Sequence, residues 1–384
     1  MCAFAQSTDN GDVTSTSLTV PTAVLERARQ AAAAYETFTG VEVDAAEVIG
    51  GRAALLGLSP NGRVSAGGAT RLMSSRDGWC ALTLSRPDDI DAVPALLGAD
   101  GVDDPWPAVE RWVADRDCAD VTERARLLGL PVAALAETPA ELARVYPFGA
   151  ATATRGPADL LVADLSAMWA GPLCAQLLSH AGATVVKVES AARPDGARSG
   201  PQSFFDWMNA GKLSYVVDFD EPTSLRALLA AADVVIESSR PAALARRGLA
   251  PTDVLPRDGR VWLRVTGHGT DGDRANWVAF GDDAAVSGGL VCGGTDDPIF
   301  CGDAIADPLT GLEAASAVVQ SLRSGGGELI EMSMAAVAAT YAQLPLEDQT
   351  GCGAMPQVSA SAGPLGADND EVEQLITQRR FAPC

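Results

Sequence analysis

The apolar and polar positions of the chain change their pattern near residue 158. From there on, short runs of mostly apolar residues alternate with stretches of helical periodicity. The apolar runs cover 160–165, 184–188, 214–218, 234–237, 261–266 and 328–334. Strands that are apolar on both faces are typical of a parallel sheet covered by helices on two sides. The pattern therefore predicts an α/β fold with a Rossmann-like, doubly wound parallel sheet over residues 158–342.

The first part of the chain follows a different pattern. Residues 1–20 are rich in Ser, Thr and Asp, which predicts a mobile tail. An alanine-rich helix is expected over 22–35, and alternating residues on both sides of Arg76-Asp-Gly78 indicate a β-hairpin within 62–84. We expect a second, smaller α+β domain over 21–147, a linker over 148–157, and a C-terminal extension over 343–384.

The charge balance narrows the choice of partners. The net charge is −22, and only Lys187 and Lys212 among the 28 basic residues are lysines. A chain this acidic repels nucleic acid and anionic membranes, so we expect neither as a partner. A solvated surface that aids solubility explains the same charge without any function. An anionic ligand would be held by local arginines, helix N-termini or backbone amides.

Cysteine and histidine positions argue against metal sites and disulfides. The eight cysteines contain no Cys-x-x-Cys pair, and His180 and His268 lie near no cluster of metal-ligand residues. No basic segment followed by an apolar run opens the chain, and no stretch approaches the length of a membrane span. We therefore expect a soluble, cytoplasmic protein without a bound metal.

One glycine-rich motif resembles a cofactor site by its letters. Gly267-His-Gly-Thr-Asp-Gly272 has the spacing of the dinucleotide fingerprint and follows an expected strand. The fingerprint needs a helix to begin at this place, so that its amides meet the pyrophosphate. The following residues lack helical periodicity, so we expect no permanently bound nicotinamide or flavin cofactor.

Aspartates gather between residues 282 and 307. The cluster contains Asp282, Asp283, Asp296, Asp297, Asp303 and Asp307. Asp307 precedes Pro308, where the helical pattern of 308–322 begins, and proline favours the first position of a helix. Asp307 is therefore expected to cap the N-terminus of a helix over 308–322, which by itself is a structural role. A carboxylate at that place is also suited to attack a thioester carbonyl, while nearby amides stabilise the oxyanion.

An ordered set of motifs resembles the family III CoA transferases, which include formyl-CoA transferase and α-methylacyl-CoA racemase. The motifs are Asp164–Pro172, Gly182–Glu189, Asn209–Lys212, Ala232–Glu237, Ile305–Gly311 and Gly325–Met334. Segments of the first 150 residues resemble the smaller domain of that family, which normally follows the large one. The chain therefore looks circularly rearranged, and the resemblance implies a homodimer.

The resemblance also implies roles for individual residues. Asp307 takes the place of the catalytic aspartate, which forms an anhydride with the acyl group and then an aspartyl-CoA thioester. The CoA-binding positions fall on Ala170, Ser238, Ser239 and Arg246. Charge and motif position add Arg193, Arg198 and Lys212, although ordinary surface cations explain these equally well. The Gly67-Gly68 pair is a candidate for the loop that covers the reacting aspartate, with a plain turn as the alternative.

One departure from the family affects the expected reaction. The racemases carry a histidine before an aspartate, whereas Gly281-Asp-Asp283 places Asp282 in that position. Without that histidine, the chain lacks one of the two bases that would act on opposite sides of the α-carbon, which argues against racemisation. We therefore expect an acyl-CoA:carboxylate CoA-transferase whose partners are an acyl-CoA and a free carboxylic acid. A racemase or isomerase acting on a CoA ester, and a non-catalytic acyl-CoA-binding protein, remain the alternatives.

Overall fold

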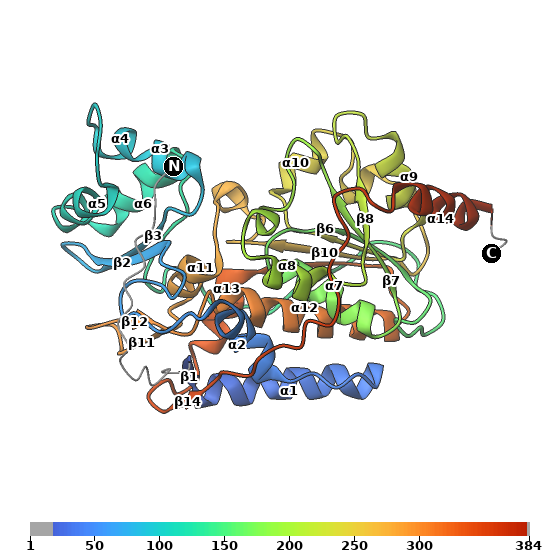
Figure 1. Cartoon of the computed structure of the whole chain (residues 1–384), viewed down its shortest axis with the longest axis horizontal. Coiled ribbons are helices and arrows are strands. Elements are labelled where there is room, and N and C mark those ends of the chain that lie inside the picture. The colour runs from blue at the N-terminus through green and yellow to red at the C-terminus, as the bar shows by residue number, and fades with distance from the viewer. Residues whose placement is uncertain (1–17, 382–384) are drawn as a thin grey trace.

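The computed structural model describes residues 18–381, and its centre is a seven-stranded sheet (Figure 1). The strands are β5 (Arg144–Pro147), β6 (Leu161–Leu165), β7 (Thr184–Glu189), β8 (Leu213–Val216), β9 (Val234–Glu237), β10 (Val261–Thr266) and β13 (Glu328–Ser333). Their order is β5-β13-β10-β9-β6-β7-β8, and all pairs are parallel except β5 with β13. The prediction of a mostly parallel α/β sheet is confirmed. The chain winds outward in one direction from β6 and in the other from β9, so the topological switch point lies between these strands.

Helices cover both faces of the sheet (Figure 1). One face packs against α7 (Ala170–His180), α12 (Ala306–Arg323) and α13 (Met334–Tyr341). The other packs against α9 (Thr223–Ala231), α10 (Pro241–Ala245) and α14 (Asn369–Phe381). Each face buries its own apolar cluster, as expected for strands that are apolar on both sides.

The N-terminal segment packs on the large sheet domain. The helix expected over 22–35 is α1 (Thr22–Thr39), and its apolar side lies against α12. The buried Tyr35 donates a hydrogen bond of 2.6 Å to the carbonyl of Leu177 in α7. β1 (Thr19–Pro21) pairs with β14 (Gln349–Gly351), and Val20 is buried. Thr19 and Val20, which fall in the expected tail, therefore belong to an ordered strand, and Leu18 is buried. Residues 1–17 lie outside the described part.

A smaller unit lies beside the sheet (Figure 1, left). It contains the three-stranded antiparallel sheet of β2 (Thr70–Ser74), β3 (Trp79–Thr83) and β4 (Val132–Ala134). Its helices are α3 (Pro87–Asp91), α4 (Val93–Leu97), α5 (Pro105–Ala114) and α6 (Cys118–Leu127), and the unit buries a separate apolar cluster. The predicted hairpin is confirmed as β2–β3. Residues 21–147, expected to form one domain, are nevertheless divided between the smaller unit and the large sheet domain. Helix α1 packs on the large sheet domain, and β5 is the edge strand of its sheet.

Two further segments join these parts. α11 (Gly281–Gly288) contacts β3 and β4 on one side and α13 on the other. The C-terminal extension reaches the far edge of the sheet, where Asp368 accepts the amide of Ser214 in β8 at 2.7 Å. The remaining elements are α2 (Ala45–Leu56), α8 (Gln202–Asn209), β11 (Val291–Cys292) and β12 (Ile299–Phe300). Between residues 18 and 381, no helix has the length and apolar character of a membrane span.

Candidate active site

Asp307 lies in the first turn of α12. The helix begins at Ala306, with Ile305 as its N-cap, so the prediction that Asp307 is the N-cap residue is wrong by two positions. The Asp307 amide donates to the carbonyl of Ala304 at 2.9 Å, which draws residue 307 into the helical turn before Pro308. Ala304 has a φ of 43°, a conformation that alanine rarely adopts. The carboxylate still sits at the positive end of a long helix.

The Asp307 carboxylate is held by close backbone neighbours. A Cβ atom on Gly281 would lie 2.4 Å from Asp307 Oδ2 and 2.2 Å from the Ala304 carbonyl, so only glycine fits there. The backbone amides of Ala170 and Gly281 are near enough to the carboxylate to oppose part of the rise that burial causes in its pKa. The side chain keeps some solvent exposure, while Gly281 and Ala170 are buried. A substrate can therefore reach the carboxylate although its surroundings are fixed.

Burial raises the pKa values of the neighbouring acids. The pKa of Asp307 is raised to about 7, chiefly by burial, with Asp282 adding to the rise and Arg52 opposing it. The pKa of Asp282 is raised to about 6 by burial and by Asp303, again against Arg52. Asp282 Oδ1 accepts the amide of Ala304 at 2.9 Å, which places it directly beside the start of α12. These carboxyl groups therefore titrate near neutral pH rather than near 4.

Asp283 is oriented away from this group. Its Oδ1 accepts hydrogen bonds from Thr83 Oγ1 at 2.8 Å and from the amide of Phe280 at 3.0 Å, so it ties α11 to strand β3. The side chain is fully buried, and burial raises its pKa to about 8. Asp283 thus joins the two units of the fold. Among residues 18–381, no group of three or more His, Cys, Asp or Glu side chains has an arrangement that would hold a metal ion.

Arg52 is the basic residue that lies among Asp282, Asp303 and Asp307, and it was not among the residues predicted from the sequence. It projects from α2, and its Nη1 donates to Oδ1 of the fully buried Asp303 at 2.7 Å. Its guanidinium carbon lies 5.6 Å from the ring centres of both Trp169 and Phe204, which hold the side chain in place. The signal that would have found it is a single charge inside the otherwise apolar run from Val48 to Leu56.

The predicted glycine loop lies beside Arg52. A Cβ atom on Gly67 would be 3.4 Å from Arg52 Nη2, and Gly68 has a φ of 78° that favours glycine. The loop from Ser65 to Gly68 is closed by a hydrogen bond between the Gly68 amide and the Ser65 carbonyl. The structure therefore brings Gly67, Arg52 and the aspartates into one region, although they come from distant parts of the chain.

Three of the predicted CoA-binding residues lie at the switch point of the sheet. Ala170 follows β6 and begins α7, whereas Ser238 and Ser239 follow β9. The two strand ends are linked by the amide of Ala167, which donates to Ser238 Oγ at 3.1 Å. Ser239 Oγ is buried and lacks a hydrogen-bond partner in the part of the chain that is described. Parallel α/β sheets bind ligands at such crevices.

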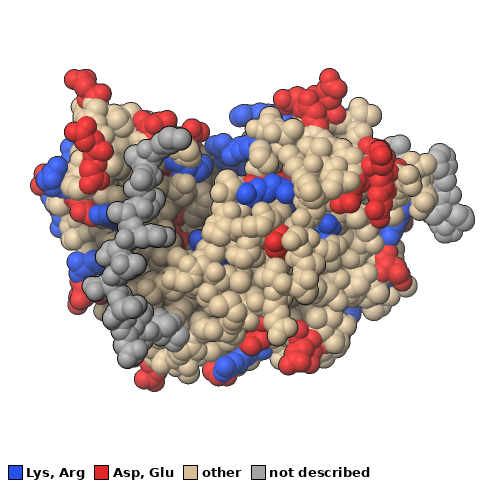
Figure 2. Space-filling view, viewed as in Figure 1, with Lys and Arg blue, Asp and Glu red and all other residues tan. Residues whose placement is uncertain are grey.

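Arg193 and Arg246 are exposed, and neither forms an ion pair with another residue between 18 and 381. Figure 2 shows the surface hollowed between the smaller unit and the sheet domain, with basic side chains near α10 beside the hollow. Arg246 is the C-cap residue of α10. Both arginines are free to bind an anion.

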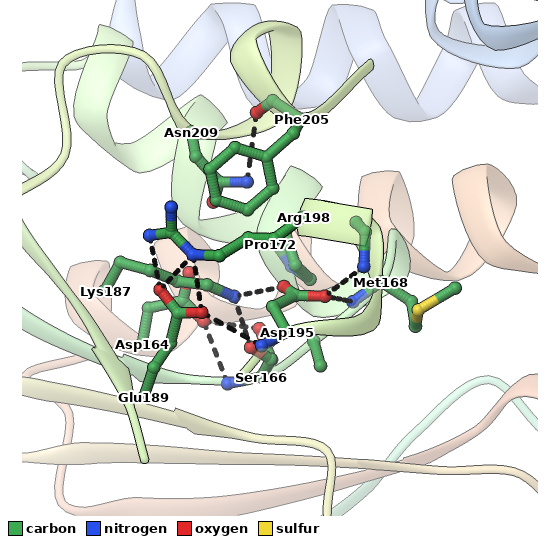
Figure 3. Close-up of polar contacts among 12 residues, drawn as sticks. Asp164, Ser166, Met168, Pro172, Lys187, Glu189, Asp195, Arg198, Phe205 and Asn209 are labelled. Atoms are coloured by element: carbon green, nitrogen blue, oxygen red, sulfur yellow. Dashed lines mark hydrogen bonds and ion pairs between the residues drawn. The ribbon is translucent and has the colours of Figure 1, made fainter. Parts of the chain in front are cut away.

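Arg198 and Lys212 are committed to buried carboxylates. Arg198 Nη2 contacts Glu189 at 2.6 Å, and its guanidinium stacks 4.3 Å from the ring of Phe205 (Figure 3). The Lys212 side chain has no exposed surface and donates to Asp164, to the Pro172 carbonyl and to Asn209 at 2.9, 2.9 and 3.1 Å. Lys212 thus supports the segment that leads from β6 into α7, and Arg198 holds the end of β7.

A second buried pair completes this support. Lys187 Nζ contacts Asp195 Oδ2 at 2.7 Å, and Asp195 Oδ1 accepts the amide of Met168 at 3.0 Å (Figure 3). Burial raises the pKa of Asp164, whereas Lys212 and Lys187 lower it, and the resulting pKa lies below the usual value for an aspartate. The loop from Ser166 to Met168, which leads into Ala170, is therefore fixed by charges beneath it.

Loss of one charge from this group should destabilise the fold. Lys212→Met would leave Asp164 buried without its main partner, so we expect the free energy of unfolding to fall by about 3–5 kcal/mol. Urea denaturation followed by circular dichroism measures the change. Arg29→Met is the matched control, because its pair with Glu26 is exposed and should contribute less than about 1 kcal/mol. Equal losses in both variants would contradict this account.

Comparisons with known proteins bear on the sheet domain. A family model described as CoA-transferase family III matches residues 158–367, more than half of the chain. The succinyl-CoA–D-citramalate CoA-transferase of Chloroflexus aurantiacus is 30% identical over 194 residues, covering 46% of this chain and 48% of that protein. The succinate–glutarate CoA-transferase of Agrobacterium fabrum is 30% identical over 197 residues, covering 45% and 49%. The chain thus spans about half the length of the curated relatives it matches.

Solved structures give a weaker likeness. The crystal structure of the hypothetical protein Rv3272 from Mycobacterium tuberculosis is 28% identical, with a TM-score of 0.44, and the match covers 49% of this chain and 56% of that chain.

Proposed function

The chain belongs to the CoA-transferase family III, and from this premise we propose that it transfers CoA from an acyl-CoA thioester to a free carboxylate. One observation carries the proposal: the Asp307 carboxylate is partly exposed in the first turn of α12, beside the amides of Ala170 and Gly281. Curated relatives of the chain are named CoA-transferases. An ionisable carboxylate with amide donors beside it is suited to acyl exchange.

The proposed reaction exchanges groups on Asp307 in four balanced steps. The Asp307 carboxylate attacks the thioester carbonyl, CoA leaves as thiolate, and a mixed anhydride forms. The thiolate attacks the aspartyl carbonyl, which releases the donor acid and leaves an aspartyl-CoA thioester. The acceptor carboxylate then attacks that thioester, forming a second anhydride and free thiolate. The thiolate finally attacks the new acyl carbonyl, which yields the product acyl-CoA and restores Asp307. Each step depends on positioning, because the exchanged groups are similar in reactivity.

We assign the CoA-binding crevice to the switch point between β6 and β9. Ser238 and Ser239 lie there with Ala170, and the Ser239 hydroxyl, which has no hydrogen-bond partner among residues 18–381, is a candidate ligand contact. Arg193 and Arg246 are the exposed cations that would meet the phosphates of CoA, because guanidinium binds phosphate through two parallel hydrogen bonds. The large negative net charge makes such local cations necessary.

We assign attraction of the acceptor acid to Arg52. An anionic acid that approaches Asp282, Asp303 and Asp307 would be repelled without a compensating charge. The Arg52 side chain is 24% exposed, and only its Nη1 is bound to Asp303. Its Nη2 lies next to Gly67 and has no hydrogen-bond partner in the described part of the chain, so it can bind a carboxylate.

Trapping the intermediate tests the proposal. The protein would be incubated with a panel of acyl-CoAs and hydroxylamine, and its peptides mapped by mass spectrometry. An aspartyl hydroxamate at Asp307 is expected, because hydroxylamine attacks both the anhydride and the thioester. CoA transfer without any adduct at Asp307 would refute the mechanism. Deuterium wash-in at the α-carbon of the acyl group, without transfer of CoA, would favour a racemase or isomerase instead.

The pH dependence of the first step follows from the pKa of Asp307. Below about pH 7 the carboxyl group holds its proton and cannot attack, so the single-turnover rate should rise with pH and level off above a midpoint near 7. Removing a neighbouring negative charge favours ionisation, so Asp282→Asn should move the midpoint to lower pH. Stopped-flow measurement of thioester loss across pH 5–9, a range of about two units on each side of that midpoint, would show both effects. An unchanged midpoint in Asp282→Asn would show that the charge of Asp282 does not affect the pKa of Asp307.

A further inference from the structure

A cavity of about 360 Å³ lies outside the site described above. It opens between the ends of β10 and β13 and the segment from Thr138 to Arg144, and the loop from Thr266 to Arg274 forms one wall. None of the lining residues belongs to the Asp307 region or to the β6–β9 switch point. The wall contains the Gly267–Gly272 motif, which the transfer reaction does not use. The cavity is therefore a separate place at the same edge of the sheet.

His268 is an unsatisfied polar group in this cavity. Its side chain is 3% exposed, and Nε2 lacks a hydrogen-bond partner within residues 18–381. Nδ1 lies 3.5 Å from Ser287 Oγ, and the ring packs edge-on against Trp277 with ring centres 5.4 Å apart. The imidazole is therefore held in one orientation. A buried polar atom without a partner costs free energy, which a hydrogen bond to a bound group would recover.

Most charges that line the cavity are already paired. Glu331 accepts from Arg264 and from Thr270 Oγ1, both at 2.8 Å. Arg144 contacts Glu141 at 2.9 Å and Asp271 at 2.5 Å. These three carboxylates and two arginines sum to a charge of −1, so they do not attract an anionic ligand.

Arg274 is the exception. It donates to Thr138 Oγ1 and to the carbonyl of Glu137, both at 3.2 Å, and it has no carboxylate partner in the described part of the chain. Burial, helped by Arg126 and Arg274, lowers the pKa of His268 to about 3, so the imidazole is neutral. Because Arg274 is a lining cation without a carboxylate partner among the described residues, a ligand atom near it is favoured when it is negative.

We propose that this cavity binds a small carboxylate, with His268 Nε2–H donating to one oxygen and Arg274 supplying the opposite charge. The neutral ring has one N–H, and the ligand selects the tautomer that carries it on Nε2. Nδ1 is then free to accept from the Ser287 hydroxyl. The volume suits a short-chain acid, the chemical class to which the acceptor and released acids of the proposed transfer belong. Binding here does not require Asp307, so the two proposals can fail separately.

The two histidines of the chain make a direct test possible. Protein with isotope-labelled histidine and no affinity tag has side-chain signals from His180 and His268 alone. His180 lies in α7 beside Gln176 and serves as the internal control. We expect succinate to shift the His268 imidazole signals with saturation, in the wild type and in Asp307→Asn. Neutral succinamide should leave them unchanged, and Arg274→Gln should weaken succinate binding about tenfold or more.

Several results would overturn the assignment. His268 signals that stay fixed at high succinate, or that move linearly together with those of His180, would exclude a specific site. Equal shifts with succinamide would show that the negative charge of the ligand plays no role. Saturation by inorganic phosphate but not by succinate would show that the site binds another anion and not a carboxylate. Unchanged affinity in Arg274→Gln, with the His180 signal showing an intact fold, would exclude Arg274 as the partner.

Discussion

Asp307→Asn should lower the rate of CoA transfer by about 10⁴-fold or more, because an amide cannot form the anhydride on which every later step depends. The substitution keeps the shape of the side chain and the close approach to Gly281, so the fold should persist. Transfer of labelled CoA from an acyl-CoA to a free acid measures the loss. The hydroxylamine adduct should vanish at the same time.

The control for this change is another aspartate of the same cluster. Asp296 is exposed in the loop between β11 and β12, so Asp296→Asn should leave transfer within about twofold of the wild type. If Asp307→Asn retained the wild-type rate while it folded normally, Asp307 would be no nucleophile. The mechanism would then have to be abandoned, although family membership would stand.

Arg52→Gln should be the second most damaging change at the site. Arg52 lowers the pKa of Asp307 and of Asp282, so its loss should raise the midpoint of the pH–rate profile. An opposite charge at this range shifts a carboxyl pKa by about one unit or more. Because the wild-type midpoint lies near pH 7, a rise of about one unit should lower the rate at pH 7 about fivefold or more. Stopped-flow thioester loss across the pH range would show a midpoint moved upward, opposite to the shift expected for Asp282→Asn.

Two further variants separate the effect of the Arg52 charge from the effect of its side-chain shape. Arg52→Lys keeps a cation near Asp303 and should therefore retain a midpoint closer to that of the wild type. Arg29→Gln removes an arginine from an exposed pair on α1 and should leave the profile unchanged. An Arg52→Gln protein that folds, turns over and keeps the wild-type midpoint would show that Arg52 only supports the structure.

Local patterns predicted those parts of the molecule that depend on local forces. The strands β6, β7, β9 and β10 follow from apolar runs, because burial on both faces requires apolar residues at successive positions. The β2–β3 hairpin follows from its turn. Asp307 was proposed from its place before Pro308 together with the family motif Ile305–Gly311. The error of two positions in its capping role arose because the turn at Ala304 already begins the helical geometry.

Long-range packing decided the rest. Nothing in the helical pattern of 22–35 indicates that α1 lies on α12, or that β5 pairs with β13 across nearly two hundred residues of chain. The sequence does not show whether a basic residue is exposed or buried. Arg198 and Lys212 were therefore candidate CoA contacts, whereas in the structure they pair with Glu189 and Asp164. Burial is a property of the fold, and it cannot be read from residue type.

By itself, the sequence determined the fold class and the family resemblance, and it led to the proposal of Asp307 as the reacting carboxylate, because each depends on short segments with a local cause. Only the tertiary structure decided the environment of that carboxylate. Arg52 from α2, Gly281 from α11 and Ala170 from α7 meet Asp307 from α12, and burial among them moves its pKa to about 7. Desolvation and charge act through space, so the chemistry of Asp307 depends on neighbours that lie far away in the chain.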